Sequence, residues 1–267
     1  MKRLSKGDFF ISKFIGFVYG VAAYCFFLVA FLYAVGFVAD WLVPKSIDSG
    51  AGGDLPASLL INTVLLGIFA VQHSVMARPG FKKWWTQIVP HSIERSTYVL
   101  LSSLALLLLY WQWQPLPDVV WEANDPAAVT ALWILLALGW LTALASTFAI
   151  SHVDLFGLRQ VYLNVRGMNY SPVDFRIVGL YKLVRHPLML GFIVAFWATP
   201  RMTVGHLFFA AATTLYIFIA LQFEERDLLA NYGDKYREYK NRVPMVLPFA
   251  GKQPAQPPGR QDARQTT

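Results

Sequence analysis

The sequence contains little charge and a single cysteine. Of its 267 residues, 15% are charged and 56% are hydrophobic, and the mean hydropathy is +0.44. These values lie far from those of ordinary soluble domains and predict an integral membrane protein. Because Cys25 is the only cysteine, an intramolecular disulfide and a metal site with paired cysteine ligands are both excluded.

Motifs typical of soluble enzymes and metal sites are also missing. The sequence has no P-loop and no glycine-rich dinucleotide fingerprint after a strand, which excludes a soluble Rossmann-type enzyme. It has no HxxxH or HExxH pattern, so we expect no metal site, although His73 and His152 as metal ligands remain an alternative. The net charge of +7 is concentrated in the loops of one side. We therefore expect no nucleic-acid partner, and no obligatory protein partner is indicated.

Long apolar runs predict an all-α integral membrane protein with about five membrane-embedded helical elements. Four runs are close to or above the length of about 20 residues that crosses a bilayer, and they cover residues 14–39, 57–76, 96–113 and 127–150. The last apolar stretch, residues 187–223, contains Pro200 and Arg201 near its middle. We expect it to turn there and form a helical hairpin whose first arm is short for a full crossing. Residues 1–250 are expected to form one transmembrane domain, and residues 251–267 a disordered tail.

The loops alternate in charge. Basic residues precede the first run and follow the second and fourth, whereas acidic residues follow the first and third runs. By the positive-inside rule, the amino terminus, residues 77–95, residues 151–186 and the carboxyl terminus all lie on the cytosolic side. The first run is expected to be retained as a helix, because no cleavage site with small residues follows it.

Charged side chains gather at the two feet of the predicted hairpin. Arg185 and His186 precede its first arm, and Glu224 and Glu225 follow its second. Charged groups near membrane depth are costly and usually have partners or a function. The two acids are suited to accept hydrogen bonds from ribose hydroxyls or to attract a sulfonium, and Arg185 is suited to a ligand carboxylate. A purely structural helix end, with Arg226 as local partner, remains the alternative.

These residues resemble a known superfamily of membrane enzymes. Residues 181–191, the acids at 224–225, residues 232–236 and Val243-Pro244 are similar to the cofactor region of the isoprenylcysteine carboxyl methyltransferases and phospholipid methyltransferases. The resemblance implies S-adenosylmethionine as cofactor and a cofactor region at about 151–248. It further implies, as cofactor-binding residues, Tyr181, Arg185, His186, Leu190, Glu224, Glu225 and Tyr236. Met189 departs from the pattern, because many relatives have an aromatic residue there.

The amino-terminal half narrows the resemblance. Residues 72–79, 94–98 and 151–160 are similar to bacterial methanethiol S-methyltransferases and, more loosely, to NnrU-like membrane proteins. This resemblance implies a small thiol substrate, methylation of methanethiol to dimethyl sulfide, a membrane lipid environment and the bacterial cytoplasmic membrane as location. Alternatives are methylation of an isoprenyl or phospholipid-like substrate, an NADPH-dependent membrane reductase, and a non-enzymatic NnrU-like protein.

Thiol methylation requires few groups. The thiolate is the nucleophile, so a base or a nearby positive charge must favour deprotonation. Candidate bases are His73 and His152. The candidate electrostatic groups are cations at Arg78, Arg95 and Arg159, with Glu94 and Asp154 as acids that orient them or tune an imidazole.

Overall fold

The protein is mostly helical, with five long apolar helices that could span a membrane. The computed structural model describes residues 6–248, with side chains described from residue 11; the tail predicted at 251–267 lies outside the described residues. The long helices are α1 (Lys6–Ala39), α2 (Leu55–Ala77), α4 (His91–Gln112), α5 (Pro126–Ile150) and α9 (Val204–Tyr232). A sixth apolar helix, α8 (Pro187–Trp197), is shorter. The predicted all-α membrane fold is thus confirmed.

Shorter elements connect the long helices. They are α3 (Pro79–Trp85), α6 (His152–Leu155), α7 (Leu158–Val165), the 3-10 helix η1 (Gly179–Lys182) and α10 (Asp234–Arg242). Two short strands, β1 (Val119–Glu122) and β2 (Arg201–Thr203), pair antiparallel with Val119 opposite Thr203 and Glu122 opposite Arg201. Local sequence explains several helix starts. Asp54 and Asp125 accept hydrogen bonds from the backbone amides of Ala57 and Ala128, at 3.1 and 2.8 Å, which is typical of N-caps.

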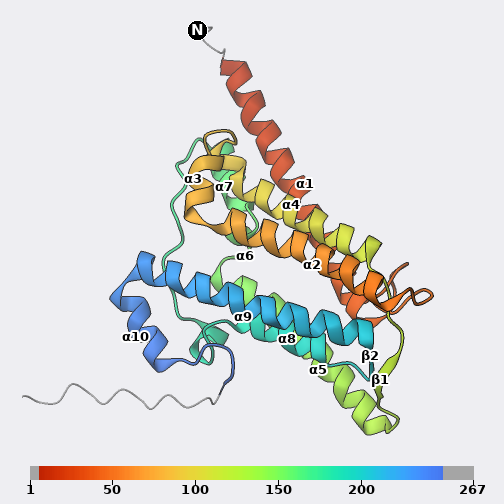
Figure 1. Ribbon diagram of the computed structural model, residues 1–267. Coiled ribbons are helices and arrows are strands. Elements are labelled where there is room, and N and C mark those ends of the chain that lie inside the picture. Colours follow the sequence, from red (N-terminus) through yellow and green to blue (C-terminus); the bar gives the residue numbers. More distant parts are fainter. Residues whose placement is uncertain (1–5, 249–267) are drawn as a thin grey trace, which may run out of the picture.

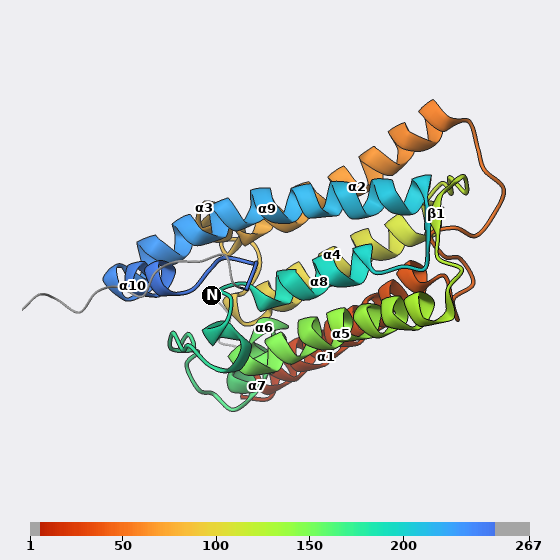
Figure 2. The same ribbon diagram turned by 90° about the horizontal axis from the view of Figure 1, so that it is seen from below.

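The connecting elements gather at two opposite ends of the molecule. Figures 1 and 2 show α3, α6, α7 and α10 at one end, and β1 and the segment between α1 and α2 at the other. The first end contains the basic segments 77–95 and 151–186. The second contains the acidic segments that follow α1 and α4. The structure therefore separates the two charge classes as the alternation predicts.

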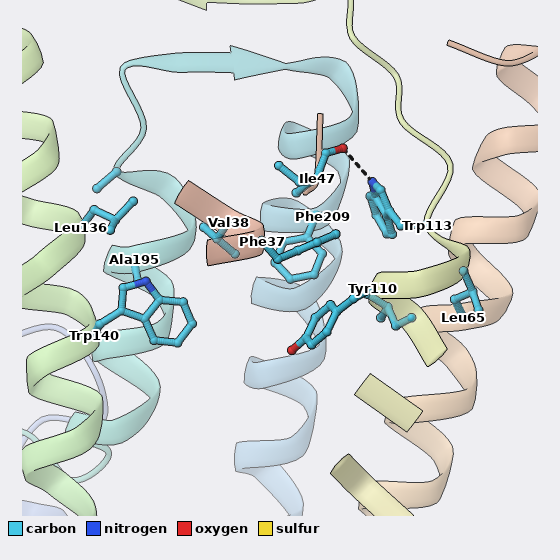
Figure 3. Close-up of a cluster of buried hydrophobic side chains, with 12 residues drawn as sticks. Phe37, Val38, Ile47, Leu65, Tyr110, Trp113, Leu136, Trp140, Ala195 and Phe209 are labelled. Carbon is cyan, nitrogen blue, oxygen red and sulfur yellow. Dashed lines mark hydrogen bonds between the residues drawn. The ribbon is translucent and has the colours of Figure 1, made fainter. Parts of the chain in front are cut away.

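An aromatic cluster joins the helices toward the β1 end. Figure 3 shows its buried side chains, among them Phe37 of α1, Tyr110 of α4 and Phe209 of α9. The indole nitrogen of Trp113 donates a hydrogen bond to the carbonyl of Ile47 at 3.1 Å. The polar side chains described below lie at the opposite end of the helices from this apolar cluster.

Helices α5 and α8 touch backbone to backbone. A Cβ added at Gly139 would lie 2.6 Å from the amide nitrogen of Ala195, and one at Gly191 would lie 2.5 Å from the amide nitrogen of Ala143. Each helix thus presents a glycine and, four residues later, an alanine, a spacing that permits close approach of membrane helices. Helix α8 packs most extensively on α5 and only lightly on α9. The close contact fixes the start of α8, where His186 lies.

The predicted hairpin needs one correction. The turn near Pro200 is confirmed, because α8 ends at Trp197 and α9 begins at Val204. Its second arm, however, does not end at Phe223 but continues through both acids to Tyr232. The sequence also predicts one short amphipathic helix that contains Tyr232, Tyr236 and Tyr239. Helix α9 ends before Gly233, whose φ of +54° favours glycine, so Tyr232 belongs to α9 and Tyr236 and Tyr239 belong to α10. Hydropathy marks only the apolar part of a helix, which explains the difference.

Candidate functional site

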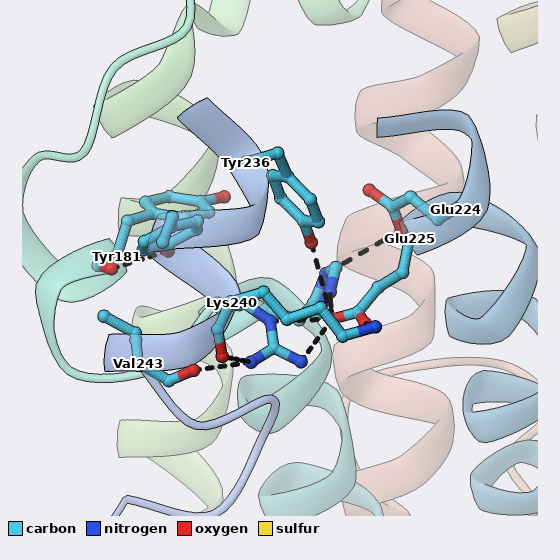
Figure 4. Close-up of polar contacts among 9 residues, drawn as sticks. Tyr181, Glu224, Glu225, Tyr236, Lys240 and Val243 are labelled. Atoms are coloured by element: carbon cyan, nitrogen blue, oxygen red, sulfur yellow. Dashed lines mark hydrogen bonds and ion pairs between the residues drawn. The ribbon is translucent and has the colours of Figure 1, made fainter. Parts of the chain in front are cut away.

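A buried carboxylate, Glu225, forms the centre of a polar network at the foot of α9. The side chain of Glu225 is 6% exposed. Its Oε1 accepts a hydrogen bond from Nε of Arg185 at 2.7 Å, and its Oε2 lies 2.7 Å from Nζ of Lys240. Figure 4 shows these contacts, to which His186 and Tyr236 add longer ones of 3.4 Å each to Oε1. The network therefore connects the start of α8 with the last turns of α9 and α10.

The guanidinium of Arg185 donates its hydrogen bonds to groups of the protein itself. Besides Glu225, its Nη1 donates to the carbonyls of Val243 and Lys240, at 2.5 and 3.1 Å. The backbone amides of Arg185 and His186 donate to the carbonyls of Pro244 and Met245, at 2.9 and 3.0 Å. This residue therefore ties the segment after α10 to the foot of α8.

The neighbouring acid differs from Glu225 in exposure. The Glu224 side chain is 47% exposed, and its Oε2 lies 3.8 Å from Nδ1 of buried His186. In Figure 4 the Glu224 carboxylate points away from the side of Glu225 that Lys240 contacts. Glu224 therefore presents a partly solvent-accessible carboxylate beside an imidazole, whereas Glu225 is enclosed by cations.

The other predicted cofactor residues lie around this network. Tyr236 is 1% exposed, and burial, then the charge of Glu225, raises the pKa of its phenol, so that it stays protonated. The backbone carbonyl of Tyr181 accepts a hydrogen bond from Tyr239 at 2.6 Å. Leu190 packs in an apolar cluster with Ile217 and Leu221. All seven predicted cofactor residues therefore belong to η1, α8, the foot of α9, α10 or the turn that joins η1 to α8.

A second polar group contains His73. The hydroxyl of Tyr98 on α4 lies 3.0 and 2.9 Å from Nδ1 and Nε2 of His73 on α2, and Ser102 lies 3.3 Å from Nδ1. The imidazole stacks on Phe69, with ring centroids 5.1 Å apart. The carboxylate of Glu224 lies near enough to Tyr98 to interact with it electrostatically. The His73 group therefore neighbours the exposed acid of the first network.

Two polar contacts join α2 to α9 beside this group. Arg78 forms an ion pair with Asp227 at 2.9 Å, and the hydroxyls of Ser74 and Tyr216 lie 3.0 Å apart. The predicted candidate Arg78 is thus paired with an acid on the turn of α9 that follows Glu224.

His152 lies in a third group. Its Nδ1 is 2.8 Å from the hydroxyl of Thr147, and its Nε2 is 2.8 Å from the hydroxyl of Tyr24 on α1. The ring stacks on Phe148, with centroids 4.2 Å apart. Burial lowers the pKa of His152. Both ring nitrogens therefore have partners within the protein, unlike those of a histidine turned toward a ligand.

The remaining candidates lie at α4 and α7. Asp154 pairs with Arg159 at 3.1 Å and accepts a hydrogen bond from Tyr170 at 3.2 Å. Glu94 and Arg95 line a cleft between α3, α4 and α7. The structure therefore brings the cofactor candidates together and divides the catalytic candidates among separate groups.

Sequence reasoning missed several residues of these groups. Tyr98, Asp227 and Lys240 were not among the candidates, yet each contacts one of them, and Tyr216 contacts Ser74, the residue after the candidate His73. Helical spacing offers a signal for two: Tyr98 follows Glu94 by four residues, and Lys240 follows Tyr236 by four. The contact of α2 with Tyr216 and Asp227 has no local signal. Among residues 6–248, no group of three or more His, Cys, Asp or Glu side chains is arranged to hold a metal ion.

Comparisons with known proteins place the chain among membrane methyltransferases. A family model described as NnrU protein matches residues 60–222. Methanethiol S-methyltransferase of Mycobacterium tuberculosis is 59% identical over 239 residues, which cover 90% of this chain and 98% of that protein. Methanethiol S-methyltransferase 2 of Bradyrhizobium diazoefficiens is 56% identical over 234 residues, or 86% and 89% of the two chains.

A more distant relative comes from an animal. Nurim of Mus musculus is 32% identical over 183 residues, which cover 64% of this chain and 68% of that protein. No solved structure matches the chain. The match to the family model ends before Glu224, so the acids at the foot of α9 lie outside it.

Proposed function

Because the chain belongs to the NnrU family of membrane proteins, we propose that it transfers a methyl group from S-adenosylmethionine to methanethiol, releasing dimethyl sulfide and S-adenosylhomocysteine. The chain is a methyltransferase acting on a thiol, since curated proteins of that name are 45–59% identical to it. That identity over about nine-tenths of the chain is the observation that carries the proposal.

The foot of α8, α9 and α10 fits the methyl donor. Glu224 offers an exposed carboxylate, which is suited to the hydroxyls of a ribose and to the positive charge of a sulfonium. Leu190 and its cluster provide an apolar wall beside it. Arg185 and Glu225 neutralise each other in a buried ion pair. Their proposed role is therefore to hold His186, Tyr236 and Glu224 in place. When bound, S-adenosylmethionine supplies an electrophilic methyl group on a sulfonium.

The thiol is proposed to lie between Glu224 and the His73 group. His73 and Tyr98 are hydrogen-bonded to each other, and His73 lies on α2, whose end contacts α9 through Ser74 and Arg78. The uncharged imidazole of His73 is suited to accept the thiol proton, either directly or through the phenol of Tyr98. The sulfur then carries the electron pair that forms the new S–C bond, while the proton resides on His73 until water removes it.

His152 is less suited to this proton transfer. It lies in the separate group formed by α1, α5 and α6, where Thr147 and Tyr24 contact its ring nitrogens, and no contact joins that group to Glu224 among the described residues. We propose that His152 stabilises the junction of these helices, and that Asp154 and Arg159 stabilise the segment after α7 by their ion pair.

The protein is an integral membrane protein, and we propose that it lies in the bacterial cytoplasmic membrane with both termini in the cytosol. The basic segments at the end of the molecule that contains α3, α7 and α10 support this orientation under the positive-inside rule. In that orientation the exposed carboxylate of Glu224 is accessible to a cytosolic methyl donor. A small apolar thiol can reach them from the bilayer or from the cytosol.

Turnover by the purified protein tests the proposed reaction. Protein in detergent is incubated with S-adenosylmethionine and methanethiol, and dimethyl sulfide is measured in the headspace by gas chromatography. We expect dimethyl sulfide in amounts that rise with protein and with both substrates. If no dimethyl sulfide forms while an isoprenylcysteine or a phosphatidylethanolamine is methylated, the thiol assignment is wrong and the substrate is a lipid.

A further inference from the structure

A polar cleft lies between α3, the start of α4 and the end of α7. It borders the residues of the proposed reaction, because Cζ of Arg95 lies 6.0 Å from the ring centroid of Tyr98. Its volume is about 350 Å³. The side chains used below are Lys82 of α3, Glu94 and Arg95 of α4, and Gln160 of α7. None of them belongs to the polar network at the foot of α9.

Two cations of the cleft lack acidic partners. In the described part of the chain, no carboxylate lies within 4.0 Å of a charged nitrogen of Lys82 or Arg95. Burial, and then the charge of Arg95, lowers the pKa of Lys82, as expected for two half-buried cations that face each other. Helix α4 begins between them after Pro90, with no side-chain cap, so its first amides add to the positive potential. An anion in the cleft would relieve this charge.

A buried polar atom of the cleft lacks a hydrogen-bond partner among the described residues. Gln160 is 7% exposed and lines the cleft, yet its Oε1 has no partner among the described residues. The amide nitrogen of Gln160, in contrast, contacts the carbonyl and the carboxylate of Asp154 at 3.4 Å each. Buried polar groups are rarely left unpaired, so the free amide oxygen of Gln160 indicates that a polar ligand belongs in the cleft. The amide oxygen of Gln160 and the carboxylate of Glu94 are hydrogen-bond acceptors, so the ligand is expected to carry a hydrogen-bond donor.

The rim of the cleft is apolar and exposed. Met168 and Tyr170, which line the cleft, are 57% and 43% exposed, and Trp84 of the neighbouring helix α3 is 52% exposed. Tryptophan beside the start of an apolar helix is typical of the membrane interface. A ligand with hydrocarbon chains would cover this rim, which a free phosphate would leave exposed.

From these observations we infer that the cleft binds the headgroup of a phospholipid that combines a phosphate with a primary ammonium. Lys82, Arg95 and the first amides of α4 face the phosphate, and Glu94 and the amide oxygen of Gln160 face the ammonium. Phosphatidylethanolamine has this chemistry. Phosphatidylcholine has the same net charge but no N–H donor, so it is the discriminating comparison.

Native mass spectrometry of the protein from micelles with equal amounts of the two lipids tests the inference. We expect one retained phosphatidylethanolamine, in excess over phosphatidylcholine. Lys82→Ala should reduce retention about tenfold, the effect of losing one charge-assisted hydrogen bond, whereas Lys83→Ala, which removes an exposed charge outside the cleft, should leave it unchanged. Gln160→Met should equalise the two lipids.

Three outcomes would overturn the inference. Equal retention of both lipids by the native protein would show that the cleft makes no contact with the ammonium group. Equal effects of Lys82→Ala and Lys83→Ala would indicate general charge attraction instead of a site. Soluble phosphoethanolamine that displaces the lipid at an equal concentration would show that the cleft binds a free phosphoryl compound and that the lipid assignment is wrong. Melting temperatures of the variants confirm that each is folded.

Discussion

At the residue scale, two adjacent acids in α9 have different environments. Glu225 is enclosed by Arg185 and Lys240, whereas Glu224 is exposed beside His186. Removing one member of a buried ion pair leaves an uncompensated charge, which costs about 3–5 kcal/mol. The sequence indicated both acids as ligand contacts because adjacency alone does not show which of them the helix turns inward.

We predict that Glu225→Gln lowers the melting temperature strongly, because the guanidinium of Arg185 stays buried without its carboxylate. Glu224→Gln should leave the melting temperature of the ligand-free protein within a few degrees of the native value. Thermal unfolding followed by intrinsic tryptophan fluorescence measures both. Equal shifts for the two variants would contradict the division of roles between them.

His152 should make stability depend on pH. Burial lowers its pKa below about 6.5, so the unfolded chain binds a proton more readily than the folded one. Its contribution to stability is therefore present above about pH 6.5 and is lost as the pH falls through that value. We predict a shallower fall of melting temperature between about pH 7 and pH 5 in His152→Gln than in the native protein. An unchanged slope would show that His152 is not the group responsible.

At the scale of elements, the contact between α5 and α8 positions the proposed donor site. Gly139 and Gly191 have no room for a Cβ, and α8 begins at the residue after His186. Apolar runs predicted α5 and the hairpin turn, but the pairing of α8 with α5 in place of α9 was not predictable. This pairing depends on Gly139 and Gly191, which are about 50 residues apart in sequence. The two glycines meet only once the helices have packed together.

We predict that Gly191→Ala lowers the melting temperature and weakens binding of S-adenosylhomocysteine, because the added methyl group separates α8 from α5. Gly67→Ala on α2 is the matched control, since a Cβ there has no neighbour within 4 Å. That control should be neutral or stabilising by about 0.5–1 kcal/mol. Thermal unfolding with and without ligand distinguishes the two variants, and an equal response would contradict close packing at Gly191.

At the scale of the whole molecule, charge separates the two ends. The positive-inside pattern predicted which loops share an end, and the structure places them together. The sequence could not indicate the pairing of β1 with β2, because the two strands are short and lie about 80 residues apart, so only the folded helices bring them together. Nor could it assign His73 to the neighbourhood of α9, which depends on the contacts of Ser74 and Arg78.

Cysteine labelling tests the proposed orientation. In a Cys25→Ser background, Lys83→Cys and Asn124→Cys each place one thiol on an exposed position at opposite ends of the molecule. We predict that a membrane-impermeant maleimide labels the second variant in intact cells and the first only after the membrane is opened. The reverse pattern would contradict cytosolic termini.

The central claim is that Glu224 at the foot of α9 faces the methyl donor. Isothermal titration calorimetry with S-adenosylhomocysteine measures this most directly in the native protein, Glu224→Gln and the control Glu238→Gln, which removes an exposed acid of α10. The account predicts binding to the native protein and the control, and affinity about tenfold lower in Glu224→Gln, as expected for a lost hydrogen bond to a charged group. Native-like affinity in Glu224→Gln would contradict it.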